Sequence, residues 1–347
     1  KILILSLLFS FLLTIQCKIT STFIPAVFTG FSKDGFLDAS IVSKQAAYFS
    51  SVSIDTVFIA GTTGESLSLT VSEREHLTEL WMEQALTHNF SVIVHVSCES
   101  ILDSRRLAAH AQKHGASGIA WFPSVYNAPG SFSSLAISFQ EVANEALSLD
   151  AFYYHIPSRT HIAPSLLPEL MSVLSSGSIS NFAGVKASID SAEQTALTQQ
   201  LFSFSSGKAT YFSGSDATIL STYLSANVRH FVGSYYNFNV LLSRRILSLA
   251  DSSLSDAQVL QSSFSSLIHA VSSWGSSVSP DSLPLKELAN LLSLHDSSLP
   301  FVGPPRLPYL PASKGAVEKL FSLVHSWCLS SVPSSERPPF CLSILSK

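Results

Sequence analysis

The stretch FAGVKAS, residues 182–188, reads as a short buried β-strand that carries a lysine. Its apolar residues do not alternate strictly with polar ones, which is typical of a strand in a parallel sheet that is covered on both faces. An ammonium group is expensive to bury without a partner. A lysine in such a strand therefore lies either at the solvated rim of the fold or in a place where its amine is used chemically.

Seven further segments share this apolar character and are bounded by Gly, Pro, Ser, Asn or Asp. They are residues 22–28, 56–61, 91–96, 118–123, 151–156, 209–214 and 229–234. Longer segments with helical periodicity separate them. Eight strands that each precede a helix predict an α/β fold of the (β/α)8 TIM-barrel type. A doubly wound sheet is the alternative, but no G-x-G-x-x-G motif follows an early strand.

Two of the intervening segments contain signals for helix ends. Ser72 and Glu75 have the spacing of a capping box and predict a helix start at the segment SEREHLTELWMEQAL. Gly115 follows residues 104–114 and is expected to end the next helix, because glycine tolerates the backbone conformation found there.

The domain boundaries follow from this alternation. Residues 18–238 are expected to form the barrel through its eighth strand. Residues 239–330 are expected to supply the last barrel helix and additional C-terminal helices, followed by a tail at 331–347. Residues 1–17 contain a lysine and a long apolar run that resemble a signal peptide, with an unrelated N-terminal extension as the alternative. A signal peptide would send the protein into the secretory pathway or out of the cell.

Composition excludes several classes of protein. The net charge is −4 and only 13% of the residues are charged, with no basic patch, so a nucleic-acid partner is not expected. The four cysteines show no metal-ligand spacing, and no metal site is predicted. Cys328 and Cys341 could form a disulfide if the chain is secreted.

In a (β/α)8 barrel the active site lies at the carboxyl ends of the strands. The second strand leads into GTTGES, residues 61–66, where backbone amides and the hydroxyls of Thr62 and Thr63 can converge on an anion. An ordinary glycine turn before a helix is the alternative. Polar residues near the ends of later strands are Tyr126, Tyr154, Lys186, Gly214, Asp216 and Ser234.

Lys186 ends the sixth strand within this ring of polar residues. A desolvated amine has a lowered pKa and can attack a carbonyl group, so Lys186 is predicted to be a Schiff-base nucleophile. A solvated charge at the rim is the alternative. In the fifth strand only one of Tyr153 and Tyr154 can point into the barrel, because successive side chains alternate between faces.

Several motifs resemble, in order and spacing, those of the pyruvate-dependent class I aldolases, the family that includes N-acetylneuraminate lyase and dihydrodipicolinate synthase. They are GTTGES followed by VSERE, then YYHIP, GVK and GSYYN. GPPRLP, residues 303–308, is similar to the animal-type lyases in particular.

The resemblance implies cleavage of N-acetylneuraminate to N-acetylmannosamine and pyruvate by a homotetramer without a metal or organic cofactor, usually in the cytoplasm. Lys186 would form the imine, and Tyr154 would take the proton of the C4 hydroxyl with help from Thr63 and Tyr126. Thr62 and Thr63 would hold the substrate carboxylate. The remaining sugar-binding positions of the family are matched by Ser188, Gly214, Asp216 and Ser234.

Two positions depart from the pattern of the sialic-acid cleaving members. Ala217 stands where those members carry a glutamate that contacts the hydroxylated tail of the sugar. Arg159 stands where dihydrodipicolinate synthases carry an arginine that meets a second carboxylate; a rim arginine without substrate contact is the alternative. A dihydrodipicolinate-synthase-like or other 2-oxo-acid aldolase, and a non-catalytic barrel that binds a 2-oxo acid, therefore remain as alternatives.

Overall fold

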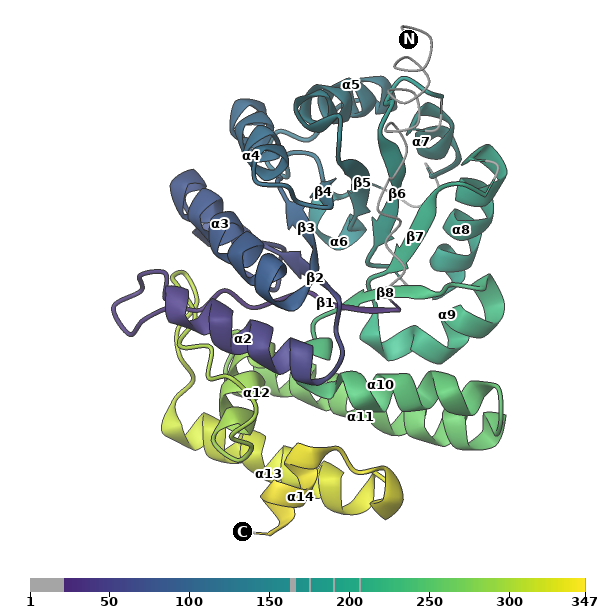
Figure 1. Ribbon diagram of the computed structural model, residues 1–347. Coiled ribbons are helices and arrows are strands. Elements are labelled where there is room, and N and C mark those ends of the chain that lie inside the picture. Colours follow the sequence, from purple (N-terminus) through teal and green to yellow (C-terminus); the bar gives the residue numbers. More distant parts are fainter. Residues whose placement is uncertain (1–21, 163–166, 175, 190, 206, 347) are drawn as a thin grey trace, which may run out of the picture.

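The computed structural model describes residues 22–162, 167–174, 176–189, 191–205 and 207–346 as a barrel of eight parallel strands (Figure 1). The strands are β1 (Phe23–Pro25), β2 (Thr56–Ile59), β3 (Ser91–His95), β4 (Gly118–Trp121), β5 (Asp150–His155), β6 (Phe182–Ala187), β7 (Thr210–Ser213) and β8 (His230–Gly233). A parallel bridge between Ala26 and Phe58 brings β1 to β2 and closes the ring. The predicted TIM barrel is confirmed, and the doubly wound alternative is wrong. The predicted signal peptide lies outside the described residues.

Helices surround the strands, and the wall of strands separates the hydrophobic core into two parts. The helices are α2 (Ala39–Ser51), α3 (Val71–His88), α4 (Ile101–Lys113), α5 (Phe132–Ala143), α6 (Pro157–Thr160), α7 (Leu167–Leu174), α8 (Ser191–Ser205), α9 (Ile219–Ala226) and α10 (Tyr236–Ala250). Side chains between strands and helices form the larger cluster, which includes Tyr153. A smaller cluster fills the barrel and includes Phe58, Phe152 and Tyr154. Alternation along β5 thus turns Tyr154 inward and Tyr153 outward.

The predicted start of α3 is wrong in its capping residue, and the predicted end of α4 is confirmed. Thr70, not Ser72, caps α3, and its hydroxyl and the Glu73 carboxylate exchange hydrogen bonds with each other's backbone amides. The sequence offers two capping-box pairs two residues apart, and the earlier one is used, while Glu75 pairs with Arg106 of α4. Gly115 has φ of +80° directly after the helix-ending residue, as predicted.

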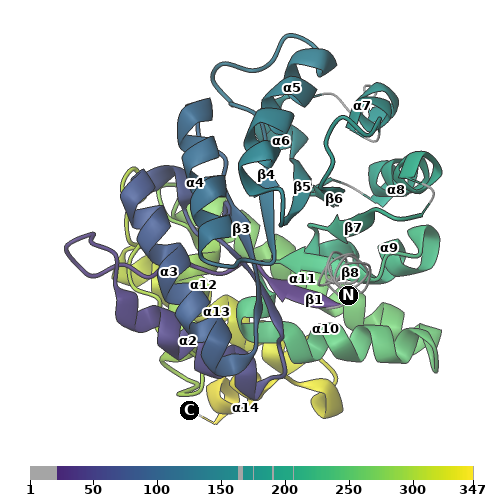
Figure 2. The same cartoon turned by 45° about the horizontal axis from the view of Figure 1, so that its top comes forward.

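Four further helices follow α10 and pack on one side of the barrel, next to α2 and β1 (Figures 1 and 2). They are α11 (Leu254–Val278), α12 (Pro284–Ser293), α13 (Lys314–Ser330) and α14 (Pro339–Leu345). A disulfide between Cys328 and Cys341 joins α13 to α14, so the segment expected to be a tail is tied to the helical extension. No helix of the described residues is both long and apolar enough to cross a membrane.

A buried ion pair anchors this helical extension to the mouth of the barrel. Lys286 of α12 donates to the Glu65 carboxylate at 2.6 Å and to the Thr29 carbonyl at 2.9 Å. The Lys286 and Glu65 side chains are only 1% and 2% exposed. The other oxygen of Glu65 accepts from the backbone amide of Arg306 at 2.9 Å. Since Glu65 belongs to the GTTGES segment, the C-terminal region holds the loop predicted to bind an anion.

We expect Lys286→Met to lower the free energy of unfolding by about 3–5 kcal/mol, because it leaves the Glu65 carboxylate buried without its cation. Urea unfolding followed by circular dichroism measures the change. Arg245→Met is the matched control, because it breaks an ion pair with Glu336 in which the arginine is 45% exposed. Such surface pairs contribute about 1 kcal/mol or less. Equal losses for the two variants would show that the buried pair does not anchor the extension.

Candidate active site

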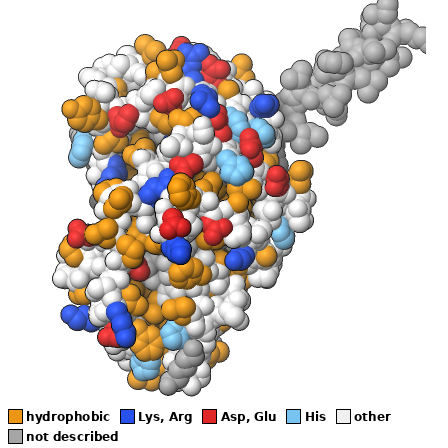
Figure 3. All heavy atoms as spheres, turned by 90° about the vertical axis from the view of Figure 1, so that its left-hand side faces the viewer, with side chains coloured by type: hydrophobic (Ala, Val, Ile, Leu, Met, Phe, Trp, Pro, Cys, Tyr) orange, Lys and Arg blue, Asp and Glu red, His pale blue; other side chains and the backbone are white. Residues whose placement is uncertain are grey.

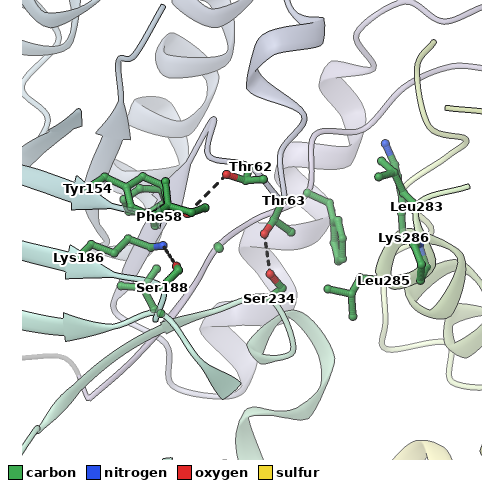
Figure 4. Close-up of a pocket in the computed structure, with 16 residues that line it drawn as sticks. Phe58, Thr62, Thr63, Tyr154, Lys186, Ser188, Ser234, Leu283, Leu285 and Lys286 are labelled. Atoms are coloured by element: carbon green, nitrogen blue, oxygen red, sulfur yellow. Dashed lines mark hydrogen bonds between the residues drawn. The ribbon is translucent and has the colours of Figure 1, made fainter. Parts of the chain in front are cut away.

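A cavity of about 280 Å³ opens at the carboxyl ends of the strands (Figure 4). Five strands, the second, fifth, sixth, seventh and eighth, or the loops that follow them, supply Gly214 and the polar side chains of its lining. These residues are Thr62, Thr63, Tyr154, Lys186, Ser188, Gly214 and Ser234. Seven of the residues predicted from sequence are therefore brought together in one place. Apolar side chains of the barrel interior, such as Phe58 and Val232, form its floor and walls.

Lys186 and Tyr154 form the centre of the cavity. They are partners in the register between β5 and β6, so their side chains point into the barrel side by side. The Lys186 side chain is almost fully enclosed, and its Nζ lies 3.7 Å from the centre of the Tyr154 ring and 5.3 Å from that of Phe58. The same Nζ donates to the Ser188 hydroxyl at 3.4 Å. The predicted strand lysine thus lies inside the cavity and not at a solvated rim.

The surroundings of Tyr154 favour its ionised form. Burial acts to raise the pKa of the phenol, but the ammonium of Lys186 and hydrogen bonds from Lys186, Thr62 and Ser188 outweigh it, and the pKa is lowered. The Thr62 hydroxyl lies 3.5 Å from the Tyr154 hydroxyl. Thr62, rather than Thr63, is therefore the threonine within reach of this phenol.

Thr63 instead faces the eighth strand. Its hydroxyl lies 2.6 Å from the Ser234 hydroxyl (Figure 4). The backbone amide of Ser234 donates to the Asp216 carboxylate at 3.2 Å. Burial raises the pKa of Asp216 to about 6, against the opposing effect of hydrogen bonds from the Ser234 and Tyr235 amides. Asp216 is thereby placed to orient Ser234.

Gly214 leaves room for this arrangement. A Cβ atom at this position would lie 2.3 Å from the Ser188 hydroxyl oxygen and 2.8 Å from the Ala187 carbonyl. The backbone amide of Gly214 donates to that same carbonyl at 2.6 Å. Any other residue would displace Ser188, which is the hydrogen-bond partner of Lys186.

A second cavity, of about 610 Å³, continues from the first and shares Ser188 and Gly214 with it. Asp216 and Ala217 line it, together with residues of α11. The Ala217 carbonyl accepts from Gln261 and Ser265 of α11, at 3.1 and 2.9 Å. The backbone at this position is therefore fixed, while the methyl side chain offers the cavity no polar group.

Tyr126 and Arg159 lie outside both cavities. Tyr126 follows β4 and is 90% exposed, with its backbone amide bonded to the Glu99 carboxylate. Arg159 is exposed on the short helix α6, which follows β5. Within this chain, neither side chain joins the Lys186 centre.

Two buried histidines near the site stay neutral. Burial lowers the pKa of His95 well below its usual value, and its Nδ1 is hydrogen-bonded to the Ala60 carbonyl at 2.8 Å. Burial also lowers the pKa of His155 to about 4. His155 lines neither of the two cavities. Both histidines are part of the packed core and not acid–base groups of the site.

One side of the cavity comes from a segment that no sequence motif indicated. Leu283, Pro284, Leu285 and Lys286 line it from the C-terminal extension (Figure 4). The proline at the first position of α12 signals a helix start, but nothing local to DSLPLKEL indicates that this helix meets the barrel mouth. The extension therefore forms a wall of the cavity and brings a second lysine into it.

Comparisons with known proteins agree with the motifs. The Dihydrodipicolinate synthetase family matches residues 20–326. The N-acetylneuraminate lyase of Danio rerio is 30% identical over 306 residues, which cover 88% of this chain and 95% of that protein. The N-acetylneuraminate lyase of Gallus gallus is 31% identical over 302 residues, with coverage of 85% and 92%.

A solved structure supports the fold independently. The N-acetylneuraminate lyase (sialic acid aldolase) from Aliivibrio salmonicida superimposes with a TM-score of 0.77 at 22% identity, and covers 90% of this chain and 98% of that chain. The extent of the sequence matches shows the family directly. The chain is an enzyme of the lyase class and belongs to the dihydrodipicolinate synthetase family.

Proposed function

We propose that the protein cleaves N-acetylneuraminate to N-acetylmannosamine and pyruvate through a Schiff base on Lys186. The observation that carries the proposal is the enclosed Nζ of Lys186 beside the Tyr154 ring, within a cavity lined by four hydroxyl-bearing side chains besides Tyr154: Thr62, Thr63, Ser188 and Ser234. The relatives named above are N-acetylneuraminate lyases, and this chain matches them over nearly their whole length.

In the proposed reaction the free amine of Lys186 attacks the C2 carbonyl, and loss of water gives a protonated imine. Tyr154 takes the proton of the C4 hydroxyl, and the electrons of the C3–C4 bond move onto the imine nitrogen. N-acetylmannosamine leaves as the aldehyde. The remaining enamine accepts a proton at C3, and water then releases pyruvate and regenerates Lys186.

The loop GTTGES supports two parts of this scheme. The hydroxyls of Thr63 and Ser234 line the same cavity as Lys186 and would hold the carboxylate next to C2. Thr62, within reach of Tyr154, would relay the proton. The Tyr126 side chain is exposed and lies outside the cavity of its own chain, so we propose that it contributes across an interface of a homotetramer.

A dihydrodipicolinate-synthase-like reaction is the second candidate, and Arg159 is the residue on which it rests. Arg159 is exposed and outside the cavities, which favours the rim interpretation over recognition of a second carboxylate. A non-catalytic barrel is disfavoured, because a binding protein has no need for an enclosed amine beside a phenol of lowered pKa.

Reduction with borohydride in the presence of pyruvate should attach a pyruvyl group to Lys186, because the imine is then trapped as a stable amine. Peptide mass mapping locates the adduct, and Lys186→Ala should abolish both the adduct and turnover. Lys286 is an internal control, because it also lines the cavity but is bonded to Glu65. An adduct on Lys286, or one that persists in Lys186→Ala, would refute the assignment.

Tyr154→Phe should lower kcat by ~10²–10⁴-fold, because general acid–base catalysis typically contributes that much. Formation of the borohydride-trapped adduct should be at least partly retained, since the amine is untouched. Tyr153→Phe is the matched control, because this neighbour points away from the barrel interior. Near-normal cleavage of N-acetylneuraminate by Tyr154→Phe would exclude the phenol as the base.

Ala217→Glu should raise kcat/KM for N-acetylneuraminate more than for shorter 2-oxo acids. A restored hydrogen bond from a charged group contributes up to about 3 kcal/mol, or up to roughly a hundredfold.

Arg159→Leu should spare sialic-acid cleavage if the arginine has no substrate contact. Efficient condensation of pyruvate with aspartate semialdehyde, lost in Arg159→Leu, together with no N-acetylneuraminate cleavage, would favour the synthase.

A further inference from the structure

Three metal-binding side chains meet on the outside of the barrel, between α3 and α4. They are Glu79 of α3, His110 of α4 and His114 at the end of α4, and each offers a ligand atom within 4.8 Å of the other two. In the part of the chain that the structure describes, no other three such side chains come together in this way. Figure 3 shows histidine and acidic side chains close together on this side of the molecule.

The distances suit a single small cation. Glu79 Oε1 lies 3.1 Å from His110 Nε2 and 3.8 Å from His114 Nε2. In a tetrahedral zinc site with bonds of ~2.1 Å, neighbouring ligand atoms are ~3.4 Å apart. The observed distances lie on either side of that value, so small side-chain rotations would give it.

The two imidazole rings face the same carboxylate oxygen. His110 and His114 are four residues apart, and both Nε2 atoms lie near Glu79 Oε1. Their rings stack with centres 4.3 Å apart and planes 25° apart, so the rings must rotate before both Nε2 lone pairs can point at one ion. The Nδ1 of His110 is enclosed, which leaves Nε2 as its outward atom. The two histidine side chains are 13% and 29% exposed, so a hydrated cation can reach them from solvent.

The charges around the cluster also favour a cation. His110 and His114 lie at the carboxyl end of α4, where the helix dipole attracts positive charge. Arg106, one turn earlier, is held by Glu75 in a separate pair. His76 lies 3.5 Å from the other oxygen of Glu79 and is not one of the three clustered ligands, so a water molecule would supply the fourth ligand.

We propose that Glu79, His110 and His114 form a Zn²⁺ site that links α3 to α4 and stabilises this side of the barrel. Imidazole and carboxylate are ligands that zinc accepts, and a cation bound only by the folded chain stabilises it. The site is separate from the Lys186 cavity and does not rest on the proposed function. It differs from the sequence-based expectation of no metal, which rested on the cysteine spacing and on the family resemblance.

Calorimetric titration of the untagged full chain with ZnCl₂ tests the site. We expect one zinc ion per chain, with at least tenfold weaker binding in His114→Ala and in Glu79→Gln. The glutamine keeps the size and hydrogen-bonding capacity of the side chain but removes the anionic ligand. Glu141→Gln and His269→Ala are matched controls, because they remove an exposed carboxylate and an exposed imidazole elsewhere, and should bind zinc as the unaltered chain does.

Two further measurements keep the test decisive if one variant folds poorly. Zinc should raise the melting temperature of the unaltered protein and not that of Glu79→Gln. Substitution with Co²⁺ should give visible absorption typical of nitrogen and oxygen ligands, without the intense near-ultraviolet band of a thiolate. Equal zinc affinity in the unaltered chain and Glu79→Gln, no zinc binding at all, or a thiolate band would overturn the proposal.

Discussion

The ion pair between Lys286 and Glu65 is the constraint on which the rest of the site depends. Glu65 follows Thr62 and Thr63 in the same short loop, and its carboxylate is bonded on one side to Lys286 and on the other to the Arg306 amide. Because both charges are almost completely buried, neither can leave the other without exposing an unpaired ion to an apolar environment. The positions of the loop hydroxyls are thereby tied to a helical extension more than two hundred residues away in sequence.

The barrel interior explains how Lys186 can be enclosed. Its neighbours are the aromatic faces of Tyr154 and Phe58, which attract an ammonium without forming an ion pair with it. A carboxylate in direct contact would stabilise the charged amine and oppose its use as a nucleophile. The charged form of Lys186 in turn lowers the pKa of Tyr154. This favours the phenolate form of Tyr154, which is the form that proton abstraction requires.

Much of the fold and the centre of the site could be predicted because both follow from local pattern. Apolar runs gave the eight strands. Alternation along β5 allowed only one of Tyr153 and Tyr154 to point inward, and the family resemblance selected Tyr154, which pairs with Lys186 in the structure. The features that the sequence did not predict depend on contacts between distant segments. The choice of Thr70 over Ser72 as the cap, the wall formed by Leu283–Lys286 and the histidine cluster of α3 and α4 each require knowing which helices become neighbours. The exposed position of Tyr126 was not predicted, and that of Arg159 was one of two alternatives, because strand ends predict proximity to the rim and not the direction of a side chain.

In the proposed reaction, catalysis and substrate selection would depend on different parts of the barrel, and this separation would make the departure at Ala217 tolerable. The Lys186 amine and the Tyr154 phenol project from paired strands, whose backbone hydrogen bonds fix them. Ala217 lies in the loop after β7, and its carbonyl is held by Gln261 and Ser265 of α11 whatever its side chain is. A change of side chain there alters the lining of the second cavity and leaves the geometry of the first intact. If the protein acts as proposed, substitutions in this loop would change the preference for the substrate tail without moving Lys186 and Tyr154.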